Sequence, residues 1–171
     1  MHVLIATDGE LDGDRAAAFT GPLAGPDGKV TVLTVVEINR TLLRDLRGLF
    51  GERIVSGTEQ DAEYVGIRPP ASTGPGADFP GDDEVLARYL GDQLEQRTAS
   101  VITALDAAGV ANEALVREGE DAASIVLESI DELDVDVVCV GSHGRGLFDG
   151  LLGSVGTKVV RRASVPVLVM R

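Results

Sequence analysis

The stretch GSHGRGLFDGLLGSVGTK, near the carboxyl end of the chain, carries the residues best suited to binding an anion. Gly141 and Gly144 have no side chains, so a ligand could closely approach the backbone N–H groups there. Gly153 and Ser154 open a short helical pattern, where free N–H groups and the helix dipole favour negative charge. Arg145 adds a positive charge. Together these features favour a phosphate cradle over a flexible connection without a ligand.

A second polar stretch, DGELDGD, follows the first apolar run of the chain. Asp8, Glu10 and Asp12 occupy the first, third and fifth positions of a calcium loop. The twelfth position must be a bidentate acid, but here it is Phe19, so the calcium interpretation fails. Asp8 ends a predicted strand, where open α/β sheets place their ligand crevice. Two roles remain open for Asp8: a turn or cap, and a ligand contact.

Several other chemistries lack the residues they need. Two histidines (His2 and His143) and one cysteine (Cys139) cannot form a usual zinc site. The nucleophile elbow of serine hydrolases is absent, and so are the Walker A and G-x-G-x-x-G patterns. Cys139 lies in the apolar run VDVVCVG and is predicted to be buried in a strand. We therefore expect no metal site and no catalytic residue.

Alternating periodicities predict the elements that position these residues. Strands are expected at 2–7, 29–37, 112–118, 135–141 and 165–171, and helices at 12–25, 82–109, 121–133 and 154–163. In the first helix, Gly21–Pro22 should break or bend the chain. Strand and helix alternate, which indicates a single doubly wound five-stranded parallel sheet with helices on both faces, in the flavodoxin or Rossmann manner. If the order is 3-2-1-4-5, Asp8 and Gly141 flank the topological switch point.

The same residues resemble a known family. The segment GSHGRGLFDGLLGS with VGTKVVRRASVPVLVMR looks like the carboxyl-terminal signature of the universal stress protein family, and VLIATDGE and TVLTVVE are similar to its amino-terminal half. The resemblance covers the chain except for 41–81. It implies an adenine nucleotide alpha hydrolase-like fold, a homodimer, and ATP bound by the 141–154 glycine loop, with Mg²⁺ or Mn²⁺ as its possible companion.

By this resemblance, Gly141 and Gly144 contact ribose and phosphates, Gly153 and Ser154 contact the phosphate chain, and Asp8 lies by the ribose or adenine. The backbone at Val36 is offered to the base. The full set of candidate nucleotide-binding residues is Ala6, Asp8, Val36, Gly141, His143, Gly144, Arg145, Gly153, Ser154 and Val155.

The glycine loop departs from the family pattern in one respect. Eight residues (RGLFDGLL) separate Gly144 from Gly153, where the ATP-binding signature has nine. Gly156 stands where the family often has alanine, which weakens the helix by roughly 1 kcal/mol. Three functions stay open: an ATP-binding regulator in the stress response, a nucleotide-free dimeric scaffold, and a weak ATPase. No water-activating residue is evident, so an enzyme is not expected.

The charge balance limits the partners. There are 28 acidic and 15 basic side chains, a net charge of −13. Such a surface repels nucleic acid and anionic membranes. It would also keep a protein soluble at high salt, and a halophilic source is the hypothesis that follows. A single cysteine and the lack of a signal peptide predict a cytoplasmic location.

Two segments carry further expectations. Residues 41–81 form an insertion of unusual length, with a helical pattern at 41–54. It is either a surface addition or a lid or partner-binding flap. The last strand has Pro166 near its start, which marks an edge, yet Val165–Met170 is too apolar for a bare edge. We expect a second copy of the strand to cover it in a two-fold dimer.

Overall fold

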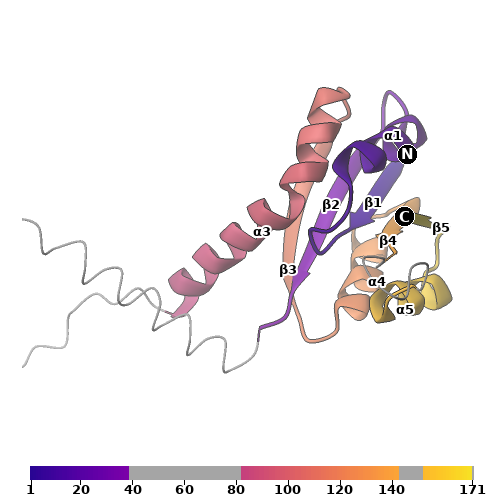
Figure 1. Ribbon diagram of the computed structural model, residues 1–171. Helices are drawn as coiled ribbons and strands as arrows, with labels where there is room; N and C mark the ends of the chain where they lie inside the picture. The colour runs from indigo at the N-terminus through magenta and orange to yellow at the C-terminus, as the bar shows by residue number, and fades with distance from the viewer. Residues whose placement is uncertain (39–81, 143–151, 171) are drawn as a thin grey trace, which may run out of the picture. The chain divides into compact units, whose positions relative to one another are not determined.

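Strands and helices alternate along the chain as the apolar periodicities predict (Figure 1). The computed structural model describes residues 1–38, 82–142 and 152–170. The elements are β1 (His2–Ala6), α1 (Gly13–Ala24), β2 (Lys29–Val36), α3 (Asp82–Ala107), β3 (Asn112–Glu118), α4 (Ala122–Glu132), β4 (Val137–Gly141), α5 (Ser154–Arg162) and β5 (Val167–Met170). Among the described helices, none is both long enough and apolar enough to cross a membrane.

The chain divides into two compact units. One comprises Met1–Ile38 and Leu90–Arg171 and holds all five strands, and the other is Asn39–Tyr89. Of the second unit, only residues 82–89 at the start of α3 are described. The predicted insertion at 41–81, with its helical pattern at 41–54 and its two interpretations, lies outside the described residues.

The five strands form one parallel sheet in the order β3-β2-β1-β4-β5. Residue Val3 pairs with Val30 of β2 on one side and with Val137 of β4 on the other. The predicted fold class and strand order are therefore confirmed. The chain leaves β1 toward β2 and later returns on the other side of β1 as β4, which places the switch point between β1 and β4.

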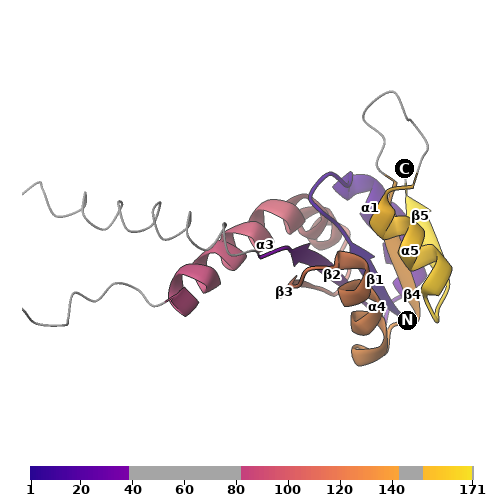
Figure 2. The ribbon, with the colours of Figure 1, turned by 90° about the horizontal axis from the view of Figure 1, so that it is seen from below.

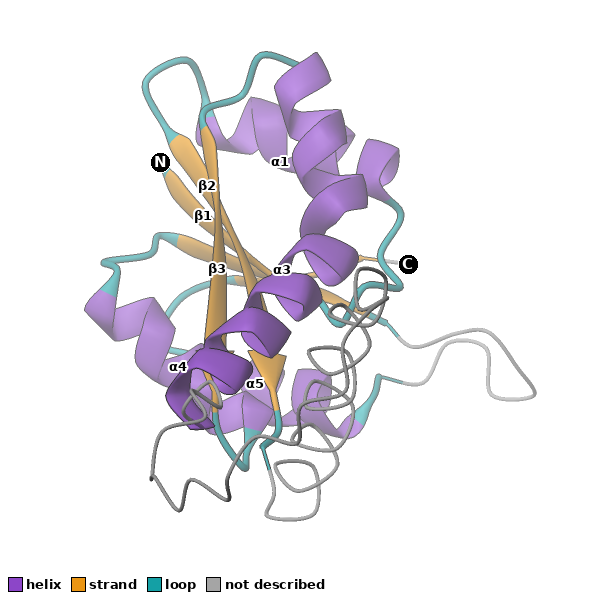
Figure 3. Cartoon of the chain, turned by 90° about the vertical axis from the view of Figure 1, so that its left-hand side faces the viewer, coloured by secondary structure: helices purple, strands orange, loops and turns teal. Residues whose placement is uncertain are grey.

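Alternate strand residues face two separate cores, so the sheet is covered on both faces (Figures 2 and 3). On one face, Val3 and Ile5 pack with α1 and with Val101 and Leu105 of α3. On the other, Leu4 packs with α4 and α5. All five of these residues are almost fully buried. Burial on both faces explains why the strands read as continuous apolar runs rather than as alternating ones.

Gly21–Pro22 was expected to break or bend α1, but the helix continues through Pro22, so the expected break does not occur. Proline removes the N–H that would bond the carbonyl four residues earlier, which is that of Ala18. Ala18 is exposed, so water can bond its carbonyl instead. The helix also ends soon afterwards, at Gly25, whose N–H donates to the carbonyl of Gly21 at 3.1 Å. The cost of Pro22 is therefore confined to the last turn.

Candidate functional site

The carboxyl ends of β1 and β4 lie side by side at the switch point. Ala6 pairs with Val140, so the turn after β1 and Gly141 leave the sheet at the same edge. A Cβ placed on Gly141 would lie 3.6 Å from Cδ1 of Leu11, an ordinary van der Waals distance. The structure thus brings the predicted residues Ala6, Asp8 and Gly141 to one edge. Among the described residues, no close packing forces position 141 to be glycine.

Helix α5 is the next described element after β4, and its N-cap residue makes no side-chain hydrogen bond to the first turn. Gly153 is the N-cap and has no side chain to bond the first-turn N–H groups. The backbone N–H of Thr157 donates to the carbonyl of Gly153 at 2.8 Å, so the helical ladder starts there. The N–H groups of Ser154 and Val155 precede that bond and have no partner within the helix. Ser154 is exposed and Val155 half-buried, so an anion could reach this turn.

Packing explains a glycine that appeared unfavourable in the sequence. A Cβ on Gly156 would lie 2.7 Å from Cδ1 and 2.9 Å from Cγ of Leu152. Leu152 packs against the core beneath α4 and α5. The glycine lets Leu152 fold back over the first turn, which offsets the lower helix propensity.

The residues after β1 form a tight turn. Gly9 donates its N–H to Oγ1 of Thr7 at 3.0 Å, and Glu10 donates to Oδ1 of Asp8 at 3.3 Å. The Asp8 side chain is exposed at this edge. Asp12, not Asp8, caps α1, since its Oδ1 accepts from the N–H of Arg15 at 2.9 Å. Asp8 therefore has the turn role that the sequence analysis allowed, at a position that a ligand can reach.

The end of β2 offers two carbonyls that face opposite ways. The carbonyl of Val36 accepts from the N–H of Gly119 at 3.2 Å, so it faces the β3 side, and the Val36 side chain is buried. The carbonyl of Val35 accepts from Nη1 of Arg97 on α3 at 3.0 Å. Sequence reasoning missed Arg97, because a single arginine within a helical pattern carries no signal of a site.

Three predicted site residues, His143, Gly144 and Arg145, lie outside the described residues. Gly153, Ser154 and Val155 are placed together at the start of α5, and Ala6, Asp8 and Gly141 at the edge of the sheet. The shortened loop that joins these two groups spans 142–152, and most of it is likewise not described.

A hollow of about 460 Å³ lies beside the turn after β1, lined by residues 9–14 and Ser100. Three of its residues, Glu10, Asp12 and Asp14, are acidic and exposed. Their negative charge disfavours a phosphate in this hollow. No group of three or more potential metal ligands occurs among the described residues.

Cys139 is fully buried in β4, as the sequence predicted. Loss of hydration raises the pKa of its thiol to about 12. A thiol of this kind stays protonated at neutral pH and is a poor nucleophile. Cys139 is therefore a packing residue.

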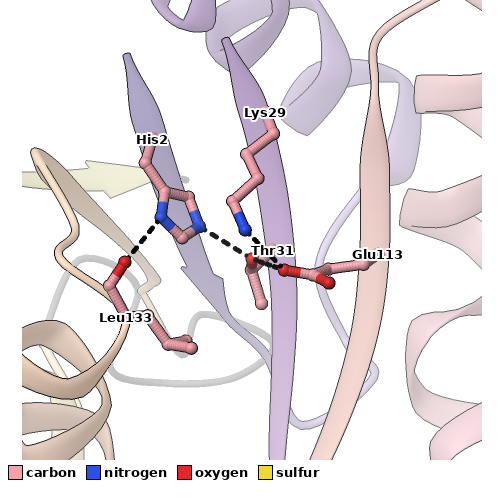
Figure 4. A network of polar contacts seen from close by, with 5 residues as sticks. All are labelled: His2, Lys29, Thr31, Glu113 and Leu133. Atoms are coloured by element: carbon pink, nitrogen blue, oxygen red, sulfur yellow. Dashed lines mark hydrogen bonds and ion pairs between the residues drawn. The ribbon is translucent and has the colours of Figure 1, made fainter.

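A polar network, buried at His2 and Thr31 and exposed at Lys29 and Glu113, joins three strands at the opposite, amino-terminal edge of the sheet (Figure 4). Nδ1 of His2 lies 3.0 Å from the carbonyl of Leu133, and Nε2 lies 2.8 Å from Oγ1 of Thr31. Thr31 donates to Oε1 of Glu113 at 2.8 Å, and Nζ of Lys29 donates to the same oxygen at 3.1 Å. The bonds from Thr31 and Lys29 hold the pKa of Glu113 below its usual value.

The fold and the carboxyl-terminal edge of the sheet together define a class of protein. A doubly wound parallel sheet, with a glycine and an open helix N-terminus after the strand at its switch point, is typical of proteins that bind anionic ligands there. Comparison with known proteins narrows the class. Residues 60–171 match the Universal stress protein family. The chain belongs to the universal stress protein family, so the resemblance seen in the sequence is confirmed.

Relatives with a similar sequence segment agree with this assignment. A 47-residue segment is 49% identical to Universal stress protein G of Salmonella typhimurium, covering 28% of this chain and 33% of that protein. The protein of the same name from Escherichia coli O157:H7 is 46% identical over 46 residues, or 27% and 32% of the two chains. These matches span about a third of the relatives' length.

Three solved structures share the fold. Hypothetical protein MJ0577 has a TM-score of 0.60 at 16% identity, with 99% of this chain and 94% of that chain covered. A universal stress protein in complex with cAMP has a TM-score of 0.52 at 21% identity, with 100% and 96% covered. A family protein from Arabidopsis thaliana with AMP bound has a TM-score of 0.52 at 17% identity, with 99% and 90% covered.

Proposed function

We propose that this protein binds an adenine nucleotide, ATP first among them, and that occupancy of the site regulates a partner in the stress response. The observation that carries the proposal is the open N-terminus of α5, which begins on Gly153 immediately after the switch-point strand and its loop. Backbone N–H groups at such a terminus bind phosphate without any basic side chain. This suits a chain with a net charge of −13.

Two further observations support an adenine nucleotide. Proteins of the same fold have been solved with cAMP and with AMP bound. Gly141 has room for a Cβ beside Leu11, so a reason other than packing among the described residues accounts for a glycine there, and close approach of a ligand is such a reason. We assign no catalytic residue, and Mg²⁺ or Mn²⁺ would enter only with the nucleotide.

The test begins with the protein as purified. Mass spectrometry would identify any retained nucleotide, and calorimetry with ATP, with and without Mg²⁺, would measure binding. Gly141→Ala is the matched variant, because its new methyl group meets only an ordinary contact and should leave the thermal midpoint unchanged. We expect ATP affinity to fall at least fivefold in this variant.

The other two functions give different results. A scaffold with an empty site would show neither retained nucleotide nor binding heat. A weak ATPase would release phosphate above the background rate, and Ser154→Ala would then slow that release. Unchanged ATP affinity in Gly141→Ala would show that the site is misplaced.

The proposal includes a homodimer formed through β5. This strand is the edge of the sheet, and Val169 is 38% exposed there although it is apolar. An apolar edge strand invites pairing with another chain. Light scattering after size exclusion in molar salt should give the mass of two chains, and Val169→Lys should give the mass of one. A wild-type monomer would contradict this part of the proposal.

A further inference from the structure

Arg97 of α3 lies across the edge where the proposed nucleotide site begins. Its stem packs on the turn after β1, since a Cβ on Gly9 would lie 3.2 Å from Cα and 3.4 Å from Cγ of Arg97. Its guanidinium reaches the end of β2, where Nη1 donates to the carbonyl of Val35 at 3.0 Å. A single side chain therefore spans from the end of β1 to the end of β2.

The carbonyl of Val35 faces the β1 side of the sheet. Two residues earlier, the carbonyl of Leu33 accepts from the N–H of Thr7, and backbone groups two residues apart along a strand point the same way. β1 ends at Ala6, in register with Leu33, so the strand ladder does not extend to Val35. The Arg97 guanidinium bonds this carbonyl in place of a neighbouring strand.

An acceptor at this position suits the exocyclic amino group of an adenine base. The carbonyl of Val36 is less suitable, because it faces β3 and already accepts from the N–H of Gly119. We infer that Arg97 is an internal competitor for the base: its guanidinium and an adenine cannot both bond the Val35 carbonyl, and a bound adenine displaces it. The inference rests on the proposed function and adds to it a residue that sets the affinity for the base.

The variant Arg97→Met tests the inference, because methionine keeps an unbranched stem for the packing on Gly9 and removes the donor. Calorimetry would compare AMP with ribose 5-phosphate, which has the same phosphate and no base. We expect Arg97→Met to bind AMP about tenfold more tightly, equivalent to about 1.4 kcal/mol, and ribose 5-phosphate as the wild type does. Arg161→Met is the matched control, since Arg161 is exposed on the last turn of α5 and its loss changes the net charge equally. It should change neither affinity.

Each other outcome has a definite meaning. Equal or weaker AMP binding in Arg97→Met overturns the inference and leaves the proposed function standing. A tenfold gain for ribose 5-phosphate also overturns it, because the effect would not involve the base. If neither protein binds AMP, ATP replaces AMP in the comparison and inorganic triphosphate replaces ribose 5-phosphate; if ATP does not bind either, the proposed function fails as well. Should Arg97→Met fold poorly by circular dichroism, Arg97→Leu serves instead, because leucine also lacks a donor, with a gain in AMP affinity expected in the same direction.

Discussion

Replacing Thr31 with valine should destabilise the protein through the network at the amino-terminal edge of the sheet. Oγ1 of Thr31 has two partners: it donates to Oε1 of Glu113 at 2.8 Å and lies 2.8 Å from Nε2 of the His2 ring. The other ring nitrogen, Nδ1, lies 3.0 Å from the carbonyl of Leu133. Valine keeps the shape of Thr31 and leaves Nε2 of the buried ring without a partner.

The expected loss of unfolding free energy in Thr31→Val follows from the burial of the residues involved. Thr31 is 0% and His2 9% exposed, so water cannot readily replace the lost bond. A buried donor or acceptor left unsatisfied costs about 1–3 kcal/mol. Glu113 loses a donor too, but its side chain is 53% exposed and can be hydrated, so it adds little. We expect the free energy of unfolding to fall by about 2 kcal/mol.

Thr34 provides a matched control on the same strand. It is also 0% exposed, but its hydroxyl has no hydrogen-bond partner among the residues that the structure describes. Thr34→Val removes an unsatisfied polar group and should raise the free energy of unfolding by about 1 kcal/mol. The same chemical change on one strand should therefore have opposite signs at the two positions.

Urea unfolding followed by circular dichroism would measure both variants, because the chain has no tryptophan for fluorescence. The slope of the unfolding free energy against urea concentration should be the same in both variants, so that the midpoint alone reports stability.

The pH dependence of stability is a second check. The pKa of Glu113 is lowered from 4.5, chiefly by Thr31, so its contribution is present above pH 4.5 and lost as pH falls through the lowered value. The loss of unfolding free energy caused by Thr31→Val should therefore become smaller as the pH falls through that range. Equal shifts of the same sign in the two variants would refute the reasoning.

Three further experiments, two comparisons of paired variants and one thiol labelling, test the structure elsewhere. Gly13→Ala should destabilise the protein by about 3 kcal/mol, since its Cβ would lie 2.2 Å from the backbone oxygen of Ser100. Gly91→Ala should stabilise it by roughly 0.5–1 kcal/mol, because a Cβ there would meet no described atom within 4 Å. Thermal unfolding would compare the two variants. Asp121→Ala should lower the thermal midpoint more than Asp121→Asn, because asparagine can still cap α4 while losing the ion pair with Lys158 that lowers the pKa of Asp121. Cys139 should not react with a thiol reagent at pH 8 until the protein unfolds, and rapid labelling of the native protein would contradict its placement.

Much of the fold could be predicted because periodicity and burial are linked. The runs around Val3 and Val138 are continuously apolar, since both faces of those strands are covered, and they identified the central pair. Asp121 was correctly predicted to begin a helix, because its side chain accepts from the N–H of Ala123. The course of α1 past Pro22 could not be predicted, because it depends on the exposure of a carbonyl one turn earlier.

The candidate site is less visible in the sequence. Glycine spacing predicted Gly141 and Gly153 as site residues, since a missing side chain is visible in a sequence. Arg97 could not be identified this way. Its role depends on the crossing of α3 over Gly9, a contact between residues 88 positions apart that leaves no local pattern.

The two edges of the sheet have separate tasks. At the amino-terminal edge, His2, Thr31 and Glu113 satisfy one another within the protein, so their bonds contribute to stability. At the carboxyl-terminal edge, the first turn of α5 has no side-chain cap, and the carbonyl of Val35 is held by one displaceable side chain. A substitution at the amino-terminal edge should therefore leave nucleotide affinity unchanged, and one at the carboxyl-terminal edge should leave stability unchanged. Thr31→Val should lower stability without changing AMP affinity, and Arg97→Met should change AMP affinity with little effect on the urea midpoint. If Thr31→Val altered AMP affinity while folded, the edges would be coupled through the strands, and this division of tasks would be wrong.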